Sequence, residues 1–138
     1  MMREHGRKGA ELFIALTATL TDESRTAMFQ RAVVPEQTCY RTPEGLLVRI
    51  DGEAISLINQ HCYEKEELLA GQIHAHPDQA YHSGADDALA LIRLPGGISM
   101  VVPHFAAGPL RPRRWSIYRR GQHGRWEPRP RRVKVKVK

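Results

Sequence analysis

The stretch Gln72-Ile73-His74-Ala75-His76-Pro77, followed after a short gap by Ser83-Gly84-Ala85-Asp86, is the part of the sequence around which the fold is organised. Its first part fits a strand, and the proline ends the pairing because it has no backbone N–H to donate. Its second part begins a predicted helix that continues to about Leu94. The stretch therefore predicts a strand-to-helix junction.

His74 and His76 can bind one metal ion together. Residues i and i+2 of a strand point to the same face, so both imidazoles can reach a single cation. Asp86 falls in the first turn of the following helix, close to the end of the strand. Two histidines and a carboxylate leave the fourth position of zinc open for water, which is the catalytic arrangement. Imidazoles disfavour magnesium and calcium, so the pattern predicts one zinc ion per chain.

Each part of this pattern also has a plainer interpretation. A His-x-His sequence on a strand is often incidental. Ser83 and Asp86 match a capping box, in which both side chains satisfy backbone N–H groups at a helix start. The combination of all these residues within thirteen positions, with a proline ending the strand, is what favours the metal site.

Length and composition favour one globular domain. A chain of 138 residues can bury a core without disulfides, and shares of 41% apolar and 26% charged residues are ordinary for a soluble protein. No apolar run reaches the roughly 18 residues that span a bilayer, and the N-terminus lacks the apolar core of a secretory signal. We therefore expect a cytoplasmic protein without a membrane partner, and Cys39 and Cys62 as free thiols.

The positive charge is concentrated at the C-terminal end. Residues 111–138 hold nine Arg and three Lys against one acid, a net +11, whereas residues 1–110 hold nine basic and fourteen acidic residues, a net −5. Such a segment, with Trp115, Tyr118 and Trp126, can bind nucleic acid or an acidic protein surface. A solvated surface whose aromatic residues pack a terminal hairpin is the favoured interpretation.

The residues before the motif predict three strands. Residues 1–9 are polar and are expected to be frayed. Residues 10–20 are mostly apolar, with Phe, Ile and Thr, and predict a buried strand. Residues 29–34 resemble a second strand that a proline stops. Residues 35–45 are predicted to be loop, and residues 46–50 to be a short strand.

A long amphipathic helix is predicted next, with Asp51 as its N-cap. Residues recurring at spacings of three and four define its buried stripe: Ala54, Leu57, Ile58, His61, Cys62, Leu68 and Leu69, interrupted by Lys65. His61 is expected in the core or at its boundary rather than as a ligand. We expect the helix to end near Ala70 and Gly71, because glycine commonly closes a helix.

The residues after the motif predict more strands. Residues 98–102 predict a buried strand, and residues 115–118 and 125–126 predict two strands around a hairpin turn. Residues 133–138 alternate Val and Lys, which leaves open an edge strand guarded by lysines or a solvated tail.

The motif resembles that of the JAMM metalloproteases of the MPN+ domain family, which have a distant Glu, then His-Ser/Thr-His-Pro, a short loop and Ser-x-x-Asp. The residues that match are His74, His76, Pro77, Ser83 and Asp86. Ala75 stands where Ser or Thr is usual, and the interval of six residues between the second histidine and the serine is shorter than usual. Residues 82–87 are most similar to bacterial members associated with ubiquitin-like conjugation operons.

The family also has a catalytic Glu at the start of an early strand. Glu11 matches, because it opens the first apolar segment and lies 63 residues before His74. A solvated acid at a strand end is the plainer interpretation. Glu23 and Glu36 lie in turn-like sequence and Glu53 begins a helix, so Glu11 is the candidate.

The resemblance implies a mechanism as well as a ligand set. Glu11 would take a proton from zinc-bound water and deliver it to the leaving amine, and the Ser83 hydroxyl would donate to the developing oxyanion. Asp87 and His82 would orient the ligands, or would be solvated residues of a helix start and a loop.

The implied reaction is cleavage of the isopeptide bond between a ubiquitin-like protein and a lysine of its target, or trimming of the modifier's C-terminal tail. The implied partners are the ubiquitin-like protein, its conjugates, and activating or conjugating enzymes of the same operon. Two alternatives remain: processing of a sulfur-carrier protein with a β-grasp fold, and a non-catalytic MPN scaffold, which the intact ligand set disfavours.

The expected fold is therefore an α/β (α+β) domain. The resemblance extends over roughly residues 8–128 and implies a cytidine-deaminase-like MPN/JAB domain, with a curved mixed β-sheet flanked by helices. We assign residues 1–128 to this domain and residues 129–138 to a basic C-terminal tail.

Overall fold

A computed structural model of the chain describes residues 2–20, 27–43, 45–78, 91–109 and 111–128. Its elements in chain order are α1 (Met2–Arg7), β1 (Phe13–Leu20), β2 (Ala27–Val33), β3 (Gln37–Thr42), β4 (Gly45–Ile50), α2 (Gly52–Lys65), β5 (Leu68–Ala75), β6 (Ile98–Val102), the 3-10 turns η1 (His104–Ala106) and η2 (Pro112–Arg114), β7 (Ser116–Arg120) and β8 (Trp126–Pro128). The fold is mixed α and β, as the sequence predicted.

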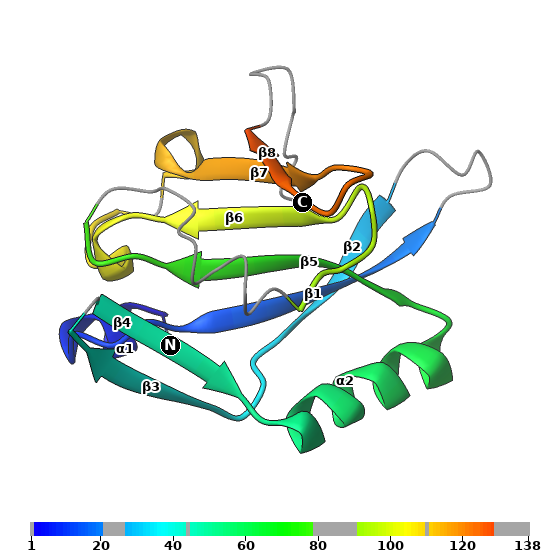
Figure 1. The fold of residues 1–138 in the computed structure, drawn as a ribbon, viewed down its shortest axis with the longest axis horizontal. Coiled ribbons are helices and arrows are strands. Elements are labelled where there is room, and N and C mark those ends of the chain that lie inside the picture. Colours follow the sequence, from blue (N-terminus) through cyan, green and yellow to red (C-terminus); the bar gives the residue numbers. More distant parts are fainter. Residues whose placement is uncertain (1, 21–26, 44, 79–90, 110, 129–138) are drawn as a thin grey trace.

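Six strands form one sheet in the order β2-β1-β5-β6-β7-β8 (Figure 1). β5 and β6 run parallel, whereas every other pair of neighbours in that order is antiparallel. β3 and β4 form a separate antiparallel hairpin. The predicted mixed sheet is therefore confirmed.

The later strands agree well with the sequence prediction. β6 has the predicted bounds, and four of its five residues are buried. The predicted turn between β7 and β8 forms as well: the Gly121 N–H donates to the Arg125 carbonyl at 2.8 Å and the Gly124 N–H to the Gly121 carbonyl at 3.1 Å. Gly124 adopts a left-handed φ of 72°, which is the conformation that glycine allows in a tight turn.

The core lies between α2 and one face of the sheet. The buried residues of α2 are Ala54, Ile58 and Cys62. Their spacing of four places them on one stripe of the helix. Ile58 and Cys62 pack with Phe13 and Ala15 of β1. Leu57, predicted to belong to the stripe, is instead 61% exposed.

The predicted end of this helix near Ala70 and Gly71 is wrong. α2 ends at Lys65, and Glu66 adopts a left-handed conformation with φ 54° that turns the chain into β5. Gly71 lies inside β5, where an added Cβ would meet the ring of Phe29 from β2. The glycine therefore allows close packing between strands and does not close the helix.

The predicted loop over residues 35–45 is also wrong in its middle. β3 occupies Gln37–Thr42 and pairs with β4 along its whole length. The two prolines of this segment lie just outside the strand, where their missing N–H groups cost no ladder hydrogen bond. They mark the ends of a strand, although in the sequence they suggested a loop.

The N-terminal residues, expected to be frayed, contain α1. This helix packs against η1, and a Cβ at Gly6 would collide with the carbonyl oxygen of Phe105. A glycine at position 6 thus permits a contact between segments about a hundred residues apart in the sequence.

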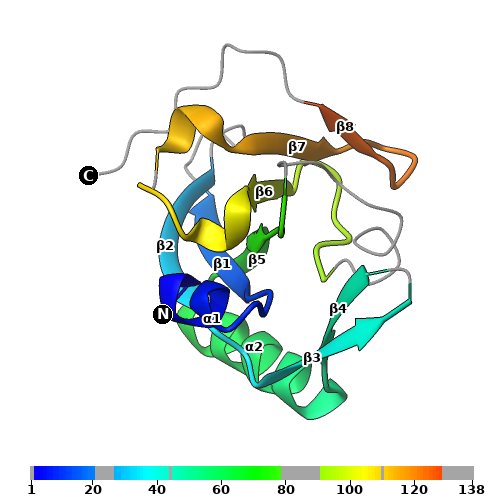
Figure 2. The ribbon, with the colours of Figure 1, turned by 90° about the vertical axis from the view of Figure 1, so that its left-hand side faces the viewer.

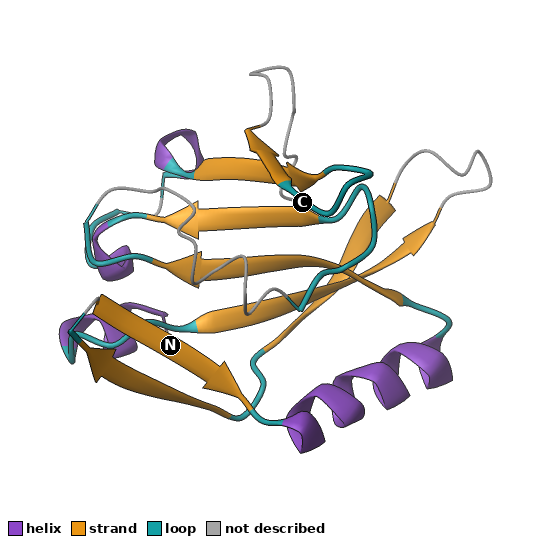
Figure 3. Ribbon diagram, viewed as in Figure 1, coloured by secondary structure: helices purple, strands orange, loops and turns teal. Residues whose placement is uncertain are grey.

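The β3–β4 hairpin and α2 cover the same face of the sheet (Figure 2). Val48 and Ile50 of β4 pack against the same cluster that α2 covers. Figure 3 shows α2 lying alongside the strands, joined to the hairpin at one end and to β5 at the other. The chain therefore leads from the hairpin through α2 directly into the strand that carries the histidines.

The second predicted helix, residues 83–94, falls mostly outside the described residues. Residues 91–94, its expected last turn, are not helical. Ile92 is buried and fills the space beside Gly97, whose N–H closes a turn onto the Leu94 carbonyl at 3.2 Å. In the part of the chain that the structure describes, no helix is long and apolar enough to cross a membrane.

Candidate metal centre

The two histidines of the motif lie at the end of β5. His74 belongs to the strand, and His76 follows its last residue, Ala75. Both are buried, with 4% and 5% of their surfaces exposed. Their ring centroids are 5.3 Å apart and their planes are inclined at 53°. The two imidazoles therefore face a common region, as the strand periodicity predicts.

This separation is compatible with one shared zinc ion. Zinc–nitrogen bonds of about 2.0–2.1 Å in a tetrahedral site place the centres of two bound imidazole rings about 5 Å apart. Neutral imidazole is also a preferred donor for zinc. Among the described residues, no group of three or more His, Cys, Asp or Glu side chains forms a complete metal site. His74 and His76 thus supply two donors that fit zinc.

The other predicted residues of the motif are not described by the structure. Asp86, the expected third ligand, and Ser83, the expected oxyanion donor, both lie in residues 79–90. His82 and Asp87 lie there too. Their predicted roles therefore stay predictions.

Glu11 lies just before β1, which begins two residues later, at Phe13. Phe13 pairs with His74, and the Ala75 N–H donates to the Leu12 carbonyl at 3.3 Å. Leu12 thus lies opposite Ala75, and continuing this register by one residue sets Glu11 opposite His76. Residues paired across antiparallel strands share a face, so Glu11 belongs to the face that carries both histidines.

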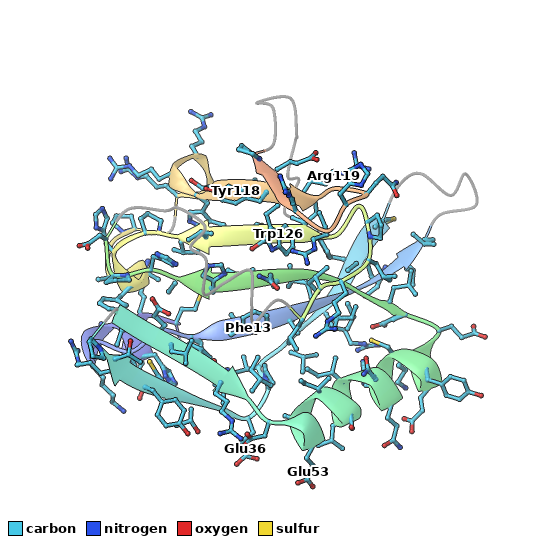
Figure 4. The ribbon with its side chains drawn as sticks, in the orientation of Figure 1. Phe13, Glu36, Glu53, Tyr118, Arg119 and Trp126 are labelled. Atoms are coloured by element: carbon cyan, nitrogen blue, oxygen red, sulfur yellow. The ribbon has the colours of Figure 1, made fainter. Side chains whose placement is uncertain are left out.

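Burial distinguishes Glu11 from the other candidates for the catalytic glutamate. Only 9% of Glu11 is exposed. Glu36 and Glu53 are both exposed, and Figure 4 shows them at the lower margin of the molecule, projecting away from the sheet. Glu23 lies outside the described residues. Of the described candidates, Glu11 is therefore the buried one, on the sheet face that carries the histidines.

Backbone hydrogen bonds hold the segment after β5. The His76 N–H donates to the Val102 carbonyl at 2.9 Å, and the Phe105 N–H donates to the His76 carbonyl at 2.7 Å. The His104 N–H donates to the Asp78 carbonyl at 2.9 Å. The end of β6 and the turn η1 thus fix the backbone on both sides of Pro77.

The turn η1 has an unusual backbone. His104, Phe105 and Ala106 have φ values of 53°, 49° and 56°. Left-handed conformations cost non-glycine residues roughly 1–2 kcal/mol each, and such strain often occurs beside functional sites. Two of these residues, His104 and Phe105, donate the N–H groups that hold the Asp78 and His76 carbonyls, whereas the Ala106 N–H donates to the Pro103 carbonyl.

Buried polar residues continue the histidine face away from the site. Gln72 lies two residues before His74, and its Nε2 donates to the Ser99 hydroxyl of β6 at 3.1 Å. Both residues are almost completely buried. Because residues 72, 74 and 76 share a face, the row of buried polar side chains extends along β5 beyond the two imidazoles.

A second buried carboxylate, Glu67, lies at the opposite end of β5. The Thr17 hydroxyl donates to it at 2.5 Å, and Arg31 Nε donates at 3.1 Å. His61 Nε2 lies 3.7 Å away. The hydrogen bond from Thr17, opposed by burial and reinforced by Arg31 and His61, holds the pKa of Glu67 below its ordinary value. His61 therefore belongs to this cluster and not to the metal centre, as expected.

The basic C-terminal region is described as far as residue 128. Trp126 is half-buried, and the guanidinium of Arg120 lies 5.1 Å from the centre of its ring. The aromatic residue thus packs within the β7–β8 hairpin, as the favoured interpretation predicted. The tail, residues 129–138, lies outside the described residues.

Sequence reasoning missed two contributors to the site. One is the backbone of η1, whose conformation has no sequence signature because its residues are not glycines. The other is Gln37, whose side chain bonds to the backbone of Phe13. A glutamine at the start of a strand gives no signal of such a role, which depends on where other strands end.

Comparisons with known proteins support a metal-dependent activity. No protein-family model matches the sequence. A protein named probable metalloprotease y4jG, from Sinorhizobium fredii (strain NBRC 101917 / NGR234), is 30% identical over 134 residues, covering 97% of this chain and 80% of that protein. The solution structure of protein DSY2949 from Desulfitobacterium hafniense is similar with a TM-score of 0.60 at 18% identity, covering 92% of this chain and 83% of that one. The latter likeness concerns the fold alone.

Proposed function

The chain belongs to the metalloprotease family of the Sinorhizobium fredii protein, and from this premise we propose that it is a zinc-dependent peptidase of the JAMM type. Its proposed reaction removes a ubiquitin-like protein from a conjugate or trims the C-terminal tail of that modifier. The observation that carries the proposal is the buried pair His74 and His76, with ring centroids 5.3 Å apart, at the end of β5 that pairs with the start of β1, just after the buried Glu11.

In this proposal the metal is held by His74, His76 and Asp86. Zinc, when bound, would polarise the carbonyl of the scissile bond and lower the pKa of its water. The remaining chemistry belongs to the chain. Glu11 would accept a proton from the attacking water and hold it at a carboxylate oxygen until the leaving amine takes it. The Ser83 hydroxyl would donate a hydrogen bond to the oxygen of the reacting carbonyl.

The burial of the site supports this assignment of roles. Glu11, His74 and His76 are all buried, so the surrounding protein rather than solvent sets their positions. Rigid support is also needed, because a general base must lie within hydrogen-bond reach of the proton it removes. The bond from the Ala75 N–H to the Leu12 carbonyl holds the residue next to Glu11, and the bonds of the His76 backbone to Val102 and Phe105 hold one proposed ligand.

The proposal extends to the MPN/JAB fold and to the partners. The parallel β5–β6 pair with histidines at its carboxyl end is consistent with such a domain. The proposed partners are a ubiquitin-like protein, its conjugates, and conjugation enzymes of the same operon.

Cleavage assays with three substrates would test the function. They are a ubiquitin-like domain fused through its C-terminus to a reporter, the same domain linked to a lysine side chain, and a β-grasp sulfur-carrier protein with a C-terminal extension. Intact-mass spectrometry would identify the bond cut. We expect cleavage of the first two substrates after the modifier's C-terminus, loss of activity with a chelator, and recovery with zinc.

Two outcomes would count against the proposal. Cleavage that survives complete chelation would exclude a metallopeptidase. Purified protein without stoichiometric zinc and without cleavage of any substrate would favour the non-catalytic scaffold. His76→Ala is the matched control for chelation, since it removes one proposed ligand while zinc remains in the buffer.

A further inference from the structure

The first residue of β1 has a strand on one side only. Phe13 pairs with His74 of β5 on that side. On the other side, β2 pairs with β1 only from Ala15, whose partner is Val33. After Val33 the chain leaves β1 through the buried Pro35, which has no N–H to offer. The backbone of Phe13 therefore reaches past the end of β2.

The side chain of Gln37 takes the place of the missing strand. The Phe13 N–H donates to Gln37 Oε1 at 2.7 Å, and Gln37 Nε2 donates to the Phe13 carbonyl at 2.9 Å. Gln37 Nε2 also donates to the Pro35 carbonyl at 3.0 Å. A primary amide presents a donor and an acceptor in one plane, as a peptide group does. One side chain thus makes both bonds that a neighbouring strand residue would make to Phe13.

These bonds act on the segment that carries Glu11. Phe13 is held by Gln37 on one edge, and the adjoining Leu12 carbonyl is held by Ala75 on the other. Glu11 directly precedes this doubly attached pair of residues. We propose that Gln37 is a positioning residue for Glu11, which fixes the β1 backbone so that the carboxylate stays beside His74 and His76. The catalytic half of this proposal rests on the proposed function.

Gln37 also connects the site to a separate part of the fold. It is the first residue of β3 and pairs with Ile50, the last residue of β4. Ile50 packs against the core cluster. The amide is therefore held by a rigid hairpin, which is what a positioning residue requires to keep another group in place.

The size of the expected effect follows from the geometry of proton transfer. A displacement of about 1 Å in a reacting group can reduce a rate about 10²-fold. Gln37→Met preserves the length of the side chain and removes all three hydrogen bonds. We expect this change to lower kcat about 10–100-fold with little change in KM, because Gln37 contacts the backbone near the base and not the substrate.

A matched control is Gln30→Met. Gln30 also has an amide that bonds to β1, donating to the Thr19 hydroxyl at 2.9 Å, but it lies near the far end of the strand. We expect this variant to keep the wild-type kcat.

Hydrogen exchange supplies a readout that does not depend on activity. In the wild-type protein the Phe13 amide should be protected. The protection should fall in Gln37→Met and remain in Gln30→Met, while zinc content, measured by elemental analysis, stays unchanged in both. A merely stabilising role would instead lower the melting temperature and raise exchange throughout the hairpin, with kcat per folded molecule preserved.

The outcomes separate the two proposals. Wild-type protein that cleaves no substrate would remove the proposed function, while the exchange rates would still decide whether Gln37 holds Phe13. Active Gln37→Met protein with kcat within about twofold of wild type would overturn the positioning role, since about tenfold is the least effect expected. An unprotected Phe13 amide in the wild type would overturn it as well.

Discussion

The antiparallel strands β1 and β5 bury one carboxylate at each end of their pairing. Glu11 precedes β1 and Glu67 precedes β5, so antiparallel pairing sends them to opposite ends, with 9% and 8% of their surfaces exposed. Glu67 is surrounded by compensating groups: the Thr17 hydroxyl and the Arg31 guanidinium both donate to it. Glu11 shares its face with two imidazoles, a type of side chain that can bind a cation.

The difference shows two ways in which a fold tolerates a buried acid. A buried charge is costly unless it is paired and hydrogen-bonded. At the Glu67 end the chain supplies the positive charge itself, and the cluster ties β1, β2 and α2 to the start of β5. At the Glu11 end the neighbours suit an external cation. We therefore expect the Glu67 end to serve stability and the Glu11 end to serve chemistry.

The strongest test makes the same substitution at both ends. Glu11→Gln should lower kcat about 10²–10⁴-fold, the usual contribution of a general base, without lowering the melting temperature. Glu67→Gln should lower the melting temperature, because an amide is a poorer acceptor for Arg31, yet leave kcat of the folded protein near wild type. Cleavage kinetics and circular dichroism measure the two effects. Equal losses of kcat in both variants would contradict the proposal that Glu11 serves catalysis and Glu67 serves stability.

Added zinc should stabilise the protein only through the Glu11 end of the β1–β5 pair, where the proposed ligands lie. At a free zinc concentration of 100 times Kd, binding to the native state contributes about 2.7 kcal/mol. We expect this increase in wild type and in Glu67→Gln, and none in His76→Ala, in thermal unfolding followed with and without added zinc. If His76→Ala gains as much stability as wild type, the ion binds at some other place.

The Glu67 cluster should make stability depend on pH. Its folded pKa lies below the unfolded value, so the folded state binds fewer protons, and the stabilisation is present above the unfolded pKa of about 4.3. It is lost as pH falls through the folded pKa. The difference in melting temperature between wild type and Glu67→Gln should therefore be largest near neutral pH and shrink below about pH 4.3.

That measurement needs a chelator throughout, so that protonation of the metal ligands does not contribute. Gln60→Met, an exposed change on α2 that removes a hydrogen bond to Glu64, is the matched control and should show no such trend. A difference that stays constant from neutral to acidic pH would mean that the Glu67 charge contributes nothing.

The smallest effect is expected at Cys62. Burial raises the pKa of its thiol, and the nearby Glu67 carboxylate adds to the rise. At neutral pH iodoacetamide should therefore modify the half-buried Cys39 first, as peptide mass spectrometry would show. Glu67→Gln removes only the lesser cause, so Cys62 should react slightly faster. If Cys62 in the wild type reacts as fast as Cys39, this account of its surroundings is wrong.

The sequence predicted those elements whose signals are local. The Gly121–Gly124 turn and the run from Ile98 to Val102 are local patterns, and both formed as expected. The paired histidines followed from the two-residue period of a strand. Metal ligands on neighbouring residues are the part of a site that sequence periodicity can reveal.

The errors arose where distant residues decide the local structure. Gly71 suggested a helix end, but it lies inside β5, where the ring of Phe29 from another strand leaves no room for a Cβ. Glu67 resembles an exposed acid at a helix end, and only the tertiary structure brings Arg31 and Thr17 to it. Gln37 replaces a strand that stops too early, which no window of sequence can show. The roles of Ser83 and Asp86 remain predictions from the motif.

The irregularity in the β1–β5 pairing limits the positions of β1 at which a residue can be inserted or deleted. The register shifts between Leu16 and Thr17, so the two segments of β1 on either side of this point are aligned independently. One residue inserted between Phe13 and Leu16 would turn Glu11 to the opposite side of the sheet. One residue inserted between Thr17 and Leu20 would leave Glu11 in place. Relatives that retain the activity should therefore vary in length near Leu20 and keep the spacing from Glu11 to Leu16.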